Sequence, residues 1–440
     1  MTGPLRWAQA TASPPLLPSG WTAADADQWL LSLELFGMRF GLDRMRRLMA
    51  ELGAPHEAFR AIHVVGTNGK SSTVRMIAAL LAQHGVRAGA YLSPHLVSYA
   101  ERIRVDGADV SPHELAAAVG RARAATELVD RTLEADDGVT QFEALTAAAY
   151  AHLAQAAVEV AVVEAGLGGR WDATNVVDAQ IAVLTNVGLE HTRWLGSTVA
   201  EIAREKLAVL APGATLVLGA DLHADADAQA RIAAEREGAT ILRAPARLDE
   251  LAPGLELLAR GAFQRRNFAV ACTAARAYLG SLEQGAIRAA AGSTEVPGRF
   301  DVVADAGGRG EIVLDGAHNS GGVAALVESL PAFLAGRPLV AVVSVLDDKD
   351  ARAMLEGLLA LCAGVVFTAS AHPRALEPAA LAALAGDLPA HVARRVGHDP
   401  RAAMALAREL AGPGGVVLAT GSIYLVADLM RPAGAPGSML

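Results

Sequence analysis

Apolar residues along the chain form short runs that alternate with stretches of helical spacing. Short runs bounded by glycine or polar residues predict buried strands, and apolar residues three and four apart predict helices. The first predicted strands are 62–65, 86–92, 158–163, 181–186 and 215–218. Between them lie alanine-rich helical stretches such as 72–84. We therefore expect an α/β fold with a P-loop-type, mostly parallel sheet and helices on both of its faces.

A second set of strands follows the Pro297-Gly298 pair. These strands are predicted at 311–314, 339–345, 365–368 and 416–419, with a hairpin turn at 307–310 and a loop at 412–415. Two short helices are expected between residues 29 and 52, interrupted near Gly37 and Gly41. A chain of 440 residues is too long for one core. We predict a flexible leader (1–20), a larger central α/β domain (21–294) and a smaller Rossmann-like C-terminal α/β domain (295–440), joined at about 292–298.

Composition narrows the class of protein. Hydrophobic residues make up 52% and charged residues 19%, and the formal charge of −9 includes no long run of one sign. This argues against a nucleic-acid-binding surface. Cys272 and Cys362 lie in apolar surroundings without a C-x-x-C pair, so we expect buried thiols in a reducing, cytoplasmic setting. No stretch approaches the ~20 apolar residues that would cross a bilayer.

A glycine-containing loop lies where the first predicted strand meets a helix. Its residues are Gly66, Thr67, Asn68, Gly69, Lys70, Ser71 and Ser72. Glycines let the backbone wrap phosphate oxygens, and the N–H groups of the helix N-terminus favour negative charge. Lys70 can reach the terminal phosphates, and a serine hydroxyl can help to hold Mg²⁺. Val64 replaces the first glycine of the general Walker pattern, so we expect a shorter phosphate loop; the alternative is a chance turn.

Other polar residues follow further strand ends, where open parallel sheets bind ligands. Glu164 ends one strand and precedes Gly166, Gly168 and Gly169, which suggests close backbone approach to a ligand. A salt-bridged glutamate is the alternative. His191 follows the next strand and Ser93 an earlier one; a lone histidine is more often structural. Lys206 has the pattern of a solvated helix lysine, and its spacing indicates no function.

Several of these segments together resemble one family. The chain is similar to folylpolyglutamate synthase/dihydrofolate synthase, within the Mur-type amide ligases, from about Gln28 to Leu429. The resemblance is carried by Gly66-Thr67-Asn68-Gly69-Lys70, Ser93-Pro94-His95-Leu96, residues 164–177 and Asp315-Gly316-Ala317-His318-Asn319. The last two segments are specific to folate ligases. Asp348-Lys349-Asp350 also resembles a family motif, and its role stays open.

The resemblance implies ATP in a cleft between two domains, and two Mg²⁺ ions. By motif position, Ser93 and Glu164 resemble ligands of the first ion, and Glu164 and His191 ligands of the second. Lys206 resembles a carbamylated lysine on the metal side. Asn267, Arg299 and Asp315 resemble ATP contacts. His318 and Ser422 resemble parts of the glutamate site.

Two positions depart from the family pattern. Ser71 stands where the family has glycine, so either Ser71 or Ser72 could face the metal. Glu190 replaces the aspartate that usually precedes the histidine. Gln141-Phe142-Glu143 could contribute to a pterin pocket or could be a packed helix start.

The predicted reaction is ATP-dependent addition of L-glutamate to a reduced folate or dihydropteroate through an acyl phosphate. Its catalytic residues would be Lys70, Glu164, His191, Lys206 and His318. We expect a monomer whose partners are small molecules, without nucleic acid or membrane. A Mur-type ligase acting on a cell-wall precursor or another carboxylate is the nearest alternative, and a non-ligase nucleotide switch is a second.

Overall fold

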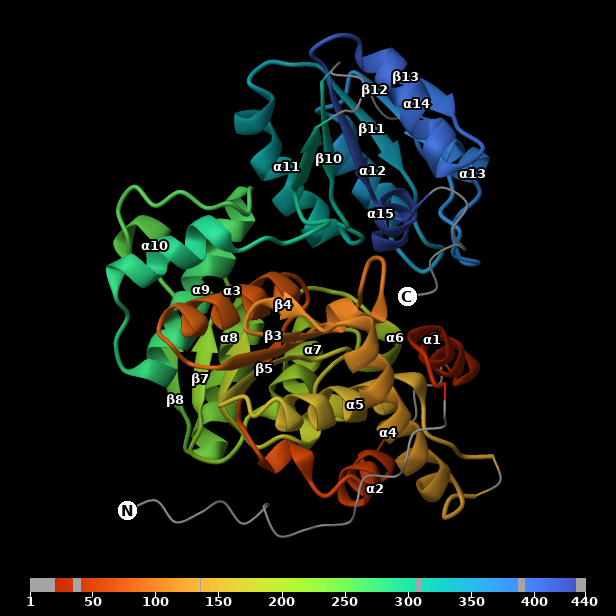
Figure 1. Ribbon diagram of the computed structural model, residues 1–440. Coiled ribbons are helices and arrows are strands. Elements are labelled where there is room, and N and C mark those ends of the chain that lie inside the picture. Colours follow the sequence, from red (N-terminus) through yellow and green to blue (C-terminus); the bar gives the residue numbers. More distant parts are fainter. Residues whose placement is uncertain (1–19, 35–40, 135, 305–309, 387–391, 433–440) are drawn as a thin grey trace. The chain divides into compact units, whose positions relative to one another are not determined.

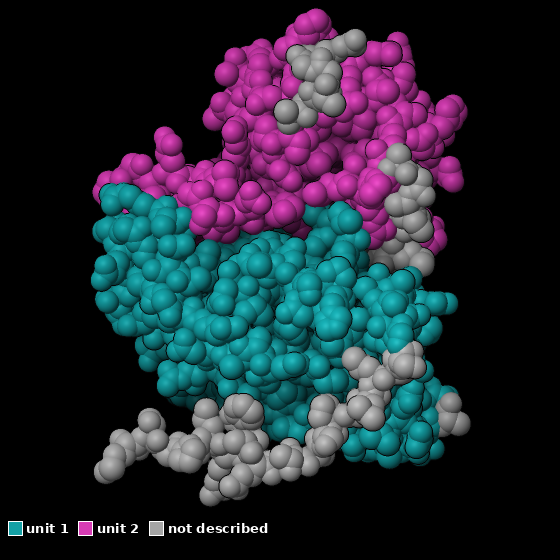
Figure 2. Space-filling model, viewed as in Figure 1, with its two compact units in different colours: residues 1–246, 269–290 teal, residues 247–268, 291–440 magenta. Residues whose placement is uncertain are grey.

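The computed structural model describes residues 20–34, 41–134, 136–304, 310–386 and 392–432. It divides into two compact units, one of residues 1–246 and 269–290 and one of residues 247–268 and 291–440 (Figure 2). The predicted domain boundary at 294/295 stays a prediction. The predicted leader, Gly37 and most of the predicted 307–310 turn lie outside the described residues.

Unit 1 is built on an eight-stranded sheet in the order β4-β3-β2-β5-β1-β6-β7-β8 (Figure 1). In the part of this order that runs β2-β5-β1-β6-β7-β8, all neighbouring strands are parallel. At the other edge, β3 pairs antiparallel with β2 and with β4. The strands are β1 (Arg60–Val65), β2 (Ala88–Tyr91), β3 (Ile103–Val105), β4 (Ala108–Asp109), β5 (Val160–Glu164), β6 (Ala179–Leu184), β7 (Thr215–Leu218) and β8 (Thr240–Arg243). The predicted mostly parallel α/β sheet is confirmed.

Helices cover both faces of this sheet. The α-helices are α1 (Ala23–Ser32), α2 (Asp43–Glu51), α3 (Lys70–Gln83), α4 (Pro112–Asp130), α5 (Gln141–Gln155), α6 (Thr192–Leu195), α7 (Val199–Lys206), α8 (Ala224–Glu237), α9 (Ala262–Leu279, shared with unit 2) and α10 (Gln284–Ser293). Single 3₁₀ turns lie at η2 (Pro55–Glu57), η3 (Tyr99–Arg102), η4 (Ala173–Val176), η5 (Leu207–Val209) and, in unit 2, η6 (Leu248–Glu250). On one face, α4 and α5 enclose a core with Ala161 and Val163 of β5. Because side chains alternate along a strand, Glu164 points to the other face, where α3 packs on β2 and β5.

Unit 2 has a separate six-stranded sheet in the order β13-β12-β11-β14-β10-β9. All pairs are parallel except β9–β10. The strands are β9 (Asp301–Ala304), β10 (Glu311–Leu314), β11 (Leu339–Val343), β12 (Gly364–Phe367), β13 (Ala393–Val396) and β14 (Val416–Thr420), and the helices are α11 (Ser320–Leu334), α12 (Ala351–Leu359), α13 (Pro378–Leu384), α14 (Pro400–Ala411) and α15 (Ile423–Met430). The predicted smaller C-terminal α/β unit is confirmed.

The expected elements differ from the structure mainly at the sheet edges. The strands β3, β4, β8, β9 and β13 carry no clear apolar run and were not predicted. Arg394 and Arg395 occupy the centre of β13, which is mostly exposed. An edge strand with solvent on one face need not be apolar, so its pattern is weak. Both cysteines are buried and free, as expected. No described helix is long and apolar enough to span a membrane.

Candidate nucleotide and metal site

The predicted phosphate loop connects β1 to α3, and two glycines determine its path. Gly66 has φ +154°, and a Cβ at this position would overlap the hydroxyl of Thr185. Gly69 has φ +83° and caps the N-terminus of α3. Other residues rarely adopt these conformations. The loop therefore turns tightly onto the first turn of a 14-residue helix, the arrangement that binds phosphate.

Residues just past β6 hold this loop in place. Asn186 and Asn68 exchange two hydrogen bonds: the backbone N–H of Asn68 donates to Asn186 Oδ1 at 2.9 Å, and Asn186 Nδ2 donates to Asn68 O at 3.0 Å. The hydroxyl of Thr185 donates to the same Asn68 carbonyl at 2.7 Å. The N–H of Gly188 donates to Thr67 Oγ1 at 3.0 Å. The predicted strand 181–186 includes Thr185 and Asn186, whereas β6 ends at Leu184, so both residues belong to the loop that follows.

Two lysine amines meet at one backbone carbonyl. Lys206 Nζ donates to Gly66 O at 2.9 Å, and Lys70 Nζ donates to the same oxygen at 3.2 Å. Lys206 is only 5% exposed, so the expectation of a solvated helix lysine is wrong. Burial, and secondarily the charge of Lys70, lower the pKa of Lys206 to about 7; Glu190 and Asp172 oppose this shift. A substantial fraction of Lys206 is therefore a neutral amine near neutral pH.

The choice of lysine at these positions is informative. The 38 basic residues of the chain include only three lysines, Lys70, Lys206 and Lys349; all others are arginine. Arginine cannot lose its proton in a protein, whereas a buried lysine can. Two of the three lysines share the Gly66 carbonyl. Both lysines at this carbonyl are therefore compact amines that can lose a proton, which arginines could not.

Glu164 joins the phosphate loop to the segment after β2. Ser71 Oγ donates to Glu164 Oε1 at 2.8 Å, and the backbone N–H of Ser93 donates to Glu164 Oε2 at 3.1 Å. Glu164 is 2% exposed. Ser71 rather than the buried Ser72 presents its hydroxyl to this carboxylate, which favours Ser71 as the metal-facing serine. Carboxylate and hydroxyl oxygens are donors that Mg²⁺ prefers.

His191 occupies a different setting from Glu164. It caps the N-terminus of α6 with φ +50°, and its side chain is 38% exposed. Its Nε2 lies 3.8 Å from Glu190 Oε1. Among the described residues, no group of three or more His, Cys, Asp or Glu side chains is arranged to hold a metal ion. The role of His191 as a ligand of a second ion therefore stays a prediction.

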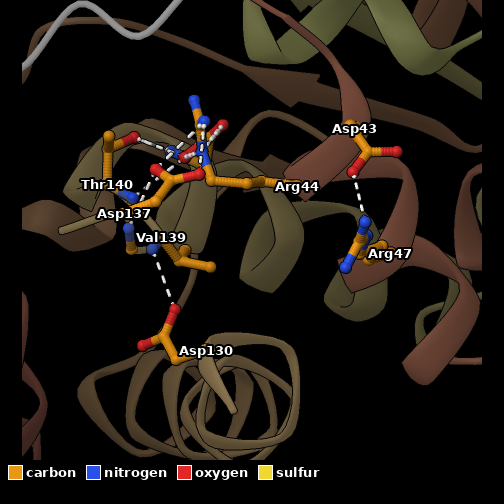
Figure 3. A network of polar contacts seen from close by, with 9 residues as sticks. Asp43, Arg44, Arg47, Asp130, Asp137, Val139 and Thr140 are labelled. Carbon is orange, nitrogen blue, oxygen red and sulfur yellow. Dashed lines mark hydrogen bonds and ion pairs between the residues drawn. The ribbon is translucent and has the colours of Figure 1, made fainter. Parts of the chain in front are cut away.

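A buried ion network holds the start of α5 (Figure 3). Arg44 Nε donates to both oxygens of Glu143 at 3.1 and 3.2 Å, and Arg44 NH1 donates to Asp137 at 3.3 Å. Glu143 also completes the capping box of α5 with Thr140. The side-chain amide of Gln141 donates to Leu30 O at 2.8 Å. Gln141 and Glu143 are thus committed to a packed helix start.

Phe142, between Gln141 and Glu143 in the sequence, packs against different residues. It stacks with Tyr91 at a centroid distance of 6.2 Å. A Cβ at Gly166, two residues past Glu164, would collide with the Phe142 ring. Phe142 therefore packs against the glycine-rich segment that follows Glu164, and its contribution to a pterin pocket stays a prediction.

In unit 2, four of the predicted residues gather at the ends of β10 and β14. Asp315 accepts the backbone N–H groups of Phe300 and Ala317, each at 2.8 Å. Burial raises the pKa of Asp315, and Arg299 is the largest opposing influence. The predicted residues Arg299, Asp315, His318 and Ser422 belong to this group. The Gly421 N–H donates to Ala317 O at 3.0 Å, which joins the loops carrying His318 and Ser422.

The remaining predicted contact, Asn267, lies on α9. It is buried, and its Nδ2 donates to Gln264 Oε1 at 3.0 Å. The adjacent Arg266 is paired with Glu328 at 2.7 Å. The role of Asn267 at adenine stays a prediction. In the motif of open role, Lys349 lies 3.4 Å from Asp348, which also pairs with Arg374.

Taken together, the glycine loop before α3, the lysine pair and Glu164 define unit 1 as a nucleotide-binding α/β unit of the P-loop kind. Residues 64–247 match the Mur ligase middle domain, and residues 298–423 match the Mur ligase glutamate ligase domain. A dihydrofolate synthase/folylpolyglutamate synthase of Bacillus subtilis is 32% identical over 436 residues, covering 92% of this chain and 98% of the relative. A probable bifunctional folylpolyglutamate synthase/dihydropteroate synthase of Haloferax volcanii is 36% identical over 429 residues; the match covers 92% of this chain but only 50% of that longer relative.

Solved structures agree with these matches. A folylpolyglutamate synthase of Mycobacterium tuberculosis complexed with ADP superposes with a TM-score of 0.83 at 32% identity, covering 94% of this chain and 99% of that one. A bifunctional enzyme of the same kind from Yersinia pestis, complexed with AMPPNP and Mn ion, has a TM-score of 0.79 at 29% identity and covers 93% and 97%. The chain belongs to the folylpolyglutamate synthase/dihydrofolate synthase family of Mur ligases, whose members are ligases.

Proposed function

We propose that this protein uses ATP and a divalent metal ion to join L-glutamate to the carboxylate of a folate or dihydropteroate. The observation that carries the proposal is the contact of Ser71 with Glu164 at 2.8 Å, one residue past Lys70 of the phosphate loop. An acidic oxygen next to the phosphate loop supports binding of the terminal phosphates through a metal ion there. Family membership gives the reaction type, and the nucleotide complexes of its relatives support the use of ATP.

The reaction needs activation of the acceptor, because a carboxylate does not condense with an amine in water. An acceptor carboxylate oxygen attacks the γ-phosphorus of ATP, the bond to the β,γ-bridging oxygen breaks, and ADP leaves. The glutamate amine then attacks the acyl carbon, phosphate departs, and the amine loses its proton. Lys70 stabilises the phosphoryl charge by position and electrostatics.

The donor set at Glu164 fits Mg²⁺. Glu164 and Ser71 offer oxygen atoms, and Ser93 lies at the same carboxylate. When bound, the ion neutralises charge on the phosphate oxygens. We assign a first ion to Ser93 and Glu164 and a second to Glu164 and His191, in line with the family pattern.

Lys206 is proposed to carry a carbamate. The ammonium first loses one proton. The neutral amine then adds to CO₂, an N–C bond forms as one C=O π bond opens, and a second proton is released, so a cation becomes an anion. Burial already lowers the pKa of Lys206 to about 7, which supplies the neutral nucleophile. The nearby charge of Lys70, which disfavours the ammonium form, favours the carbamate.

Unit 2 is proposed to supply the remaining contacts. Asn267, Arg299 and Asp315 are assigned to ATP, and His318 and Ser422 to the incoming glutamate. The carboxyl ends of β12 and β14 bear the hydroxyls of Thr368, Ser370 and Thr420, each buried without a hydrogen-bond partner among the described residues. Such hydroxyls could serve a polar ligand. We also propose a monomeric, cytoplasmic enzyme, in keeping with its two free cysteines.

The deciding experiment measures ATP-dependent incorporation of labelled glutamate with dihydropteroate and tetrahydrofolate side by side. We expect incorporation with at least one acceptor, one phosphate released per glutamate, and none without acceptor or amino acid. Phosphate release that needs neither would indicate a nucleotide switch. Incorporation only into a cell-wall precursor would indicate a different Mur-type ligase.

A further inference from the structure

A fully buried histidine in the centre of β1 has no role in the reaction above. His63 Nε2 lies 2.8 Å from Thr174 Oγ1 in η4, which follows Glu164 by ten residues. The Thr174 hydroxyl is in turn a donor to Asp172 Oδ1. The chain His63–Thr174–Asp172 thus runs from the sheet into the segment that begins at Glu164. These three side chains are buried.

The hydrogen bonds define which proton His63 carries. Asp172 accepts the N–H of Thr174 at 3.0 Å on Oδ1 and the N–H of Leu167 at 2.7 Å on Oδ2, and Gly166 donates to it as well. Burial raises the pKa of Asp172, and the hydrogen bonds from Thr174, Leu167 and Gly166 oppose this rise. With donors on both oxygens, Asp172 accepts the one hydroxyl proton of Thr174. The proton between Thr174 and His63 must then belong to His63 Nε2.

The surroundings of Nδ1, the other ring nitrogen of His63, favour the same Nε2–H tautomer. His63 Nδ1 is buried and has no hydrogen-bond partner among the described residues. An N–H left there would be an unsatisfied donor, whereas a bare lone pair is the less costly state. Burial also lowers the pKa of His63 to about 4. The ring is therefore a neutral donor at physiological pH.

The segment that His63 holds contacts the residues proposed for catalysis at its start and in its middle. Glu164 begins it, and Asp172 fixes its glycine turn through Leu167. In the middle, a Cβ at Gly169 would collide with the carbonyl oxygens of Glu205 and Lys206. The backbone N–H of Arg170 donates to Glu205 O at 3.1 Å. The path of this segment therefore limits where the end of α7, and with it Lys206, can lie.

We propose that His63 is a positioning residue of the ligase: as a neutral Nε2–H donor it fixes Thr174 and Asp172, and through them the segment between Glu164 and the Lys206 end of α7. This inference rests on the proposed function. His63 itself touches neither Lys206 nor Glu164 through any hydrogen bond of the described residues. Its effect on the reaction is indirect, through backbone placement.

The test compares His63→Gln with His63→Leu. A glutamine amide can place an N–H near the Nε2 position, whereas leucine fills a similar volume without a donor. For His63→Leu we expect kcat for glutamate incorporation to fall about tenfold or more, because small displacements of reacting groups are costly. KM for ATP should stay within about twofold, since the phosphate loop is held separately by Asn186. His63→Gln should recover most of kcat.

Equal kcat in the leucine variant and the wild type, with folding confirmed by melting, would overturn the inference but leave the ligase function standing. Equal loss in both variants would also overturn it, since the donor would then be irrelevant. If His63→Leu does not fold, the kcat of His63→Gln and the protonation state of the His63 ring test the proposal instead. In NMR spectra of ¹⁵N-histidine-labelled wild type, we expect His63 to have a protonated Nε2 and an unprotonated Nδ1 from pH 6 to 8. The reverse tautomer would refute the proposal. That measurement holds even if no folate acceptor is used.

Discussion

Unit 1 contains two clusters of buried and half-buried charge that are built in opposite ways. In the network at the start of α5, one cation, Arg44, faces two carboxylates, Glu143 and Asp137, at 3.1 to 3.4 Å. In the candidate site, two amines, Lys70 and Lys206, share one neutral carbonyl. The first cluster satisfies its charges within the fold. In the second, crowded cluster, burial first and the charge of Lys70 second lower the pKa of Lys206, the arrangement expected where a ligand completes the site.

The difference between the clusters predicts opposite effects of mutation on activity and on stability. Changes in the crowded cluster should remove activity and leave the fold stable, whereas changes in the paired cluster should weaken the fold and spare the chemistry of molecules that remain folded. Stability and function should therefore separate between two regions of the same unit.

The largest effect is expected in the crowded cluster. Lys70→Ala and Glu164→Gln should each lower kcat for glutamate incorporation by about 10³-fold, because both remove charge aimed at the transferring phosphoryl group. The melting temperature should change little. Glu164→Gln keeps an acceptor for Ser71, so it isolates charge from packing. Near-normal turnover in either variant would remove that residue from the site.

The paired cluster should respond in the reverse sense. Arg44→Met leaves Glu143 and Asp137 without their buried cation and should lower the free energy of unfolding by about 3 kcal/mol. Urea denaturation measures this loss. Arg47→Met, whose partner Asp43 is exposed, is the matched control and should lose less than about 1 kcal/mol. A loss of activity without a loss of stability in Arg44→Met would contradict the structural role of the paired cluster.

Lys206→Met should abolish ligation yet stabilise the protein in CO₂-free buffer at pH 7 by about 2 kcal/mol, because a buried cation is removed. The folded-state pKa of about 7 lies below the ordinary value of 10.5, so the unfolded chain binds more protons between these pH values. Wild-type stability therefore rises with pH through this window, and the advantage of the variant should shrink. A constant difference from pH 7 to 10 would contradict the depressed pKa.

The smallest expected effect extends the comparison to unit 2. Thr420 is fully buried, and its hydroxyl has no partner among the described residues. Thr420→Val should stabilise the protein by about 1 kcal/mol and raise KM for glutamate severalfold. Thr146→Val is the control, since Thr146 Oγ1 bonds to Phe142 O at 2.7 Å; it should destabilise. Destabilisation by Thr420→Val would mean that its hydroxyl already serves the fold.

The sequence predicted those parts of the fold and site that are local. The central strands and the loop from Gly66 to Ser71 are recognisable because a buried parallel strand is continuously apolar and a phosphate loop needs glycine at fixed spacing. The edge strands β8 and β13 were missed because their exposed faces leave no such pattern.

The site contacts that local patterns do not show join distant segments. Lys206 is a predicted site residue only through the family resemblance. Lys206 reaches Gly66 across 140 positions, and Asn186 reaches Asn68 across 118. Nothing in the helical spacing of 199–206 shows that its last residue is buried. His63 reads as one more member of an apolar strand, and only the fold reveals its contact with Thr174. Local patterns predict elements, whereas buried polar contacts are set by tertiary packing.

The central claim is that Glu164 holds a divalent ion beside a triphosphate on the Lys70 loop. Electron paramagnetic resonance of Mn²⁺, titrated with AMPPNP, tests it directly on wild type and Glu164→Gln. We expect tight, nucleotide-dependent Mn²⁺ binding in the wild type that is weakened at least about tenfold in the variant. Equal Mn²⁺ affinity in the two proteins would contradict the account.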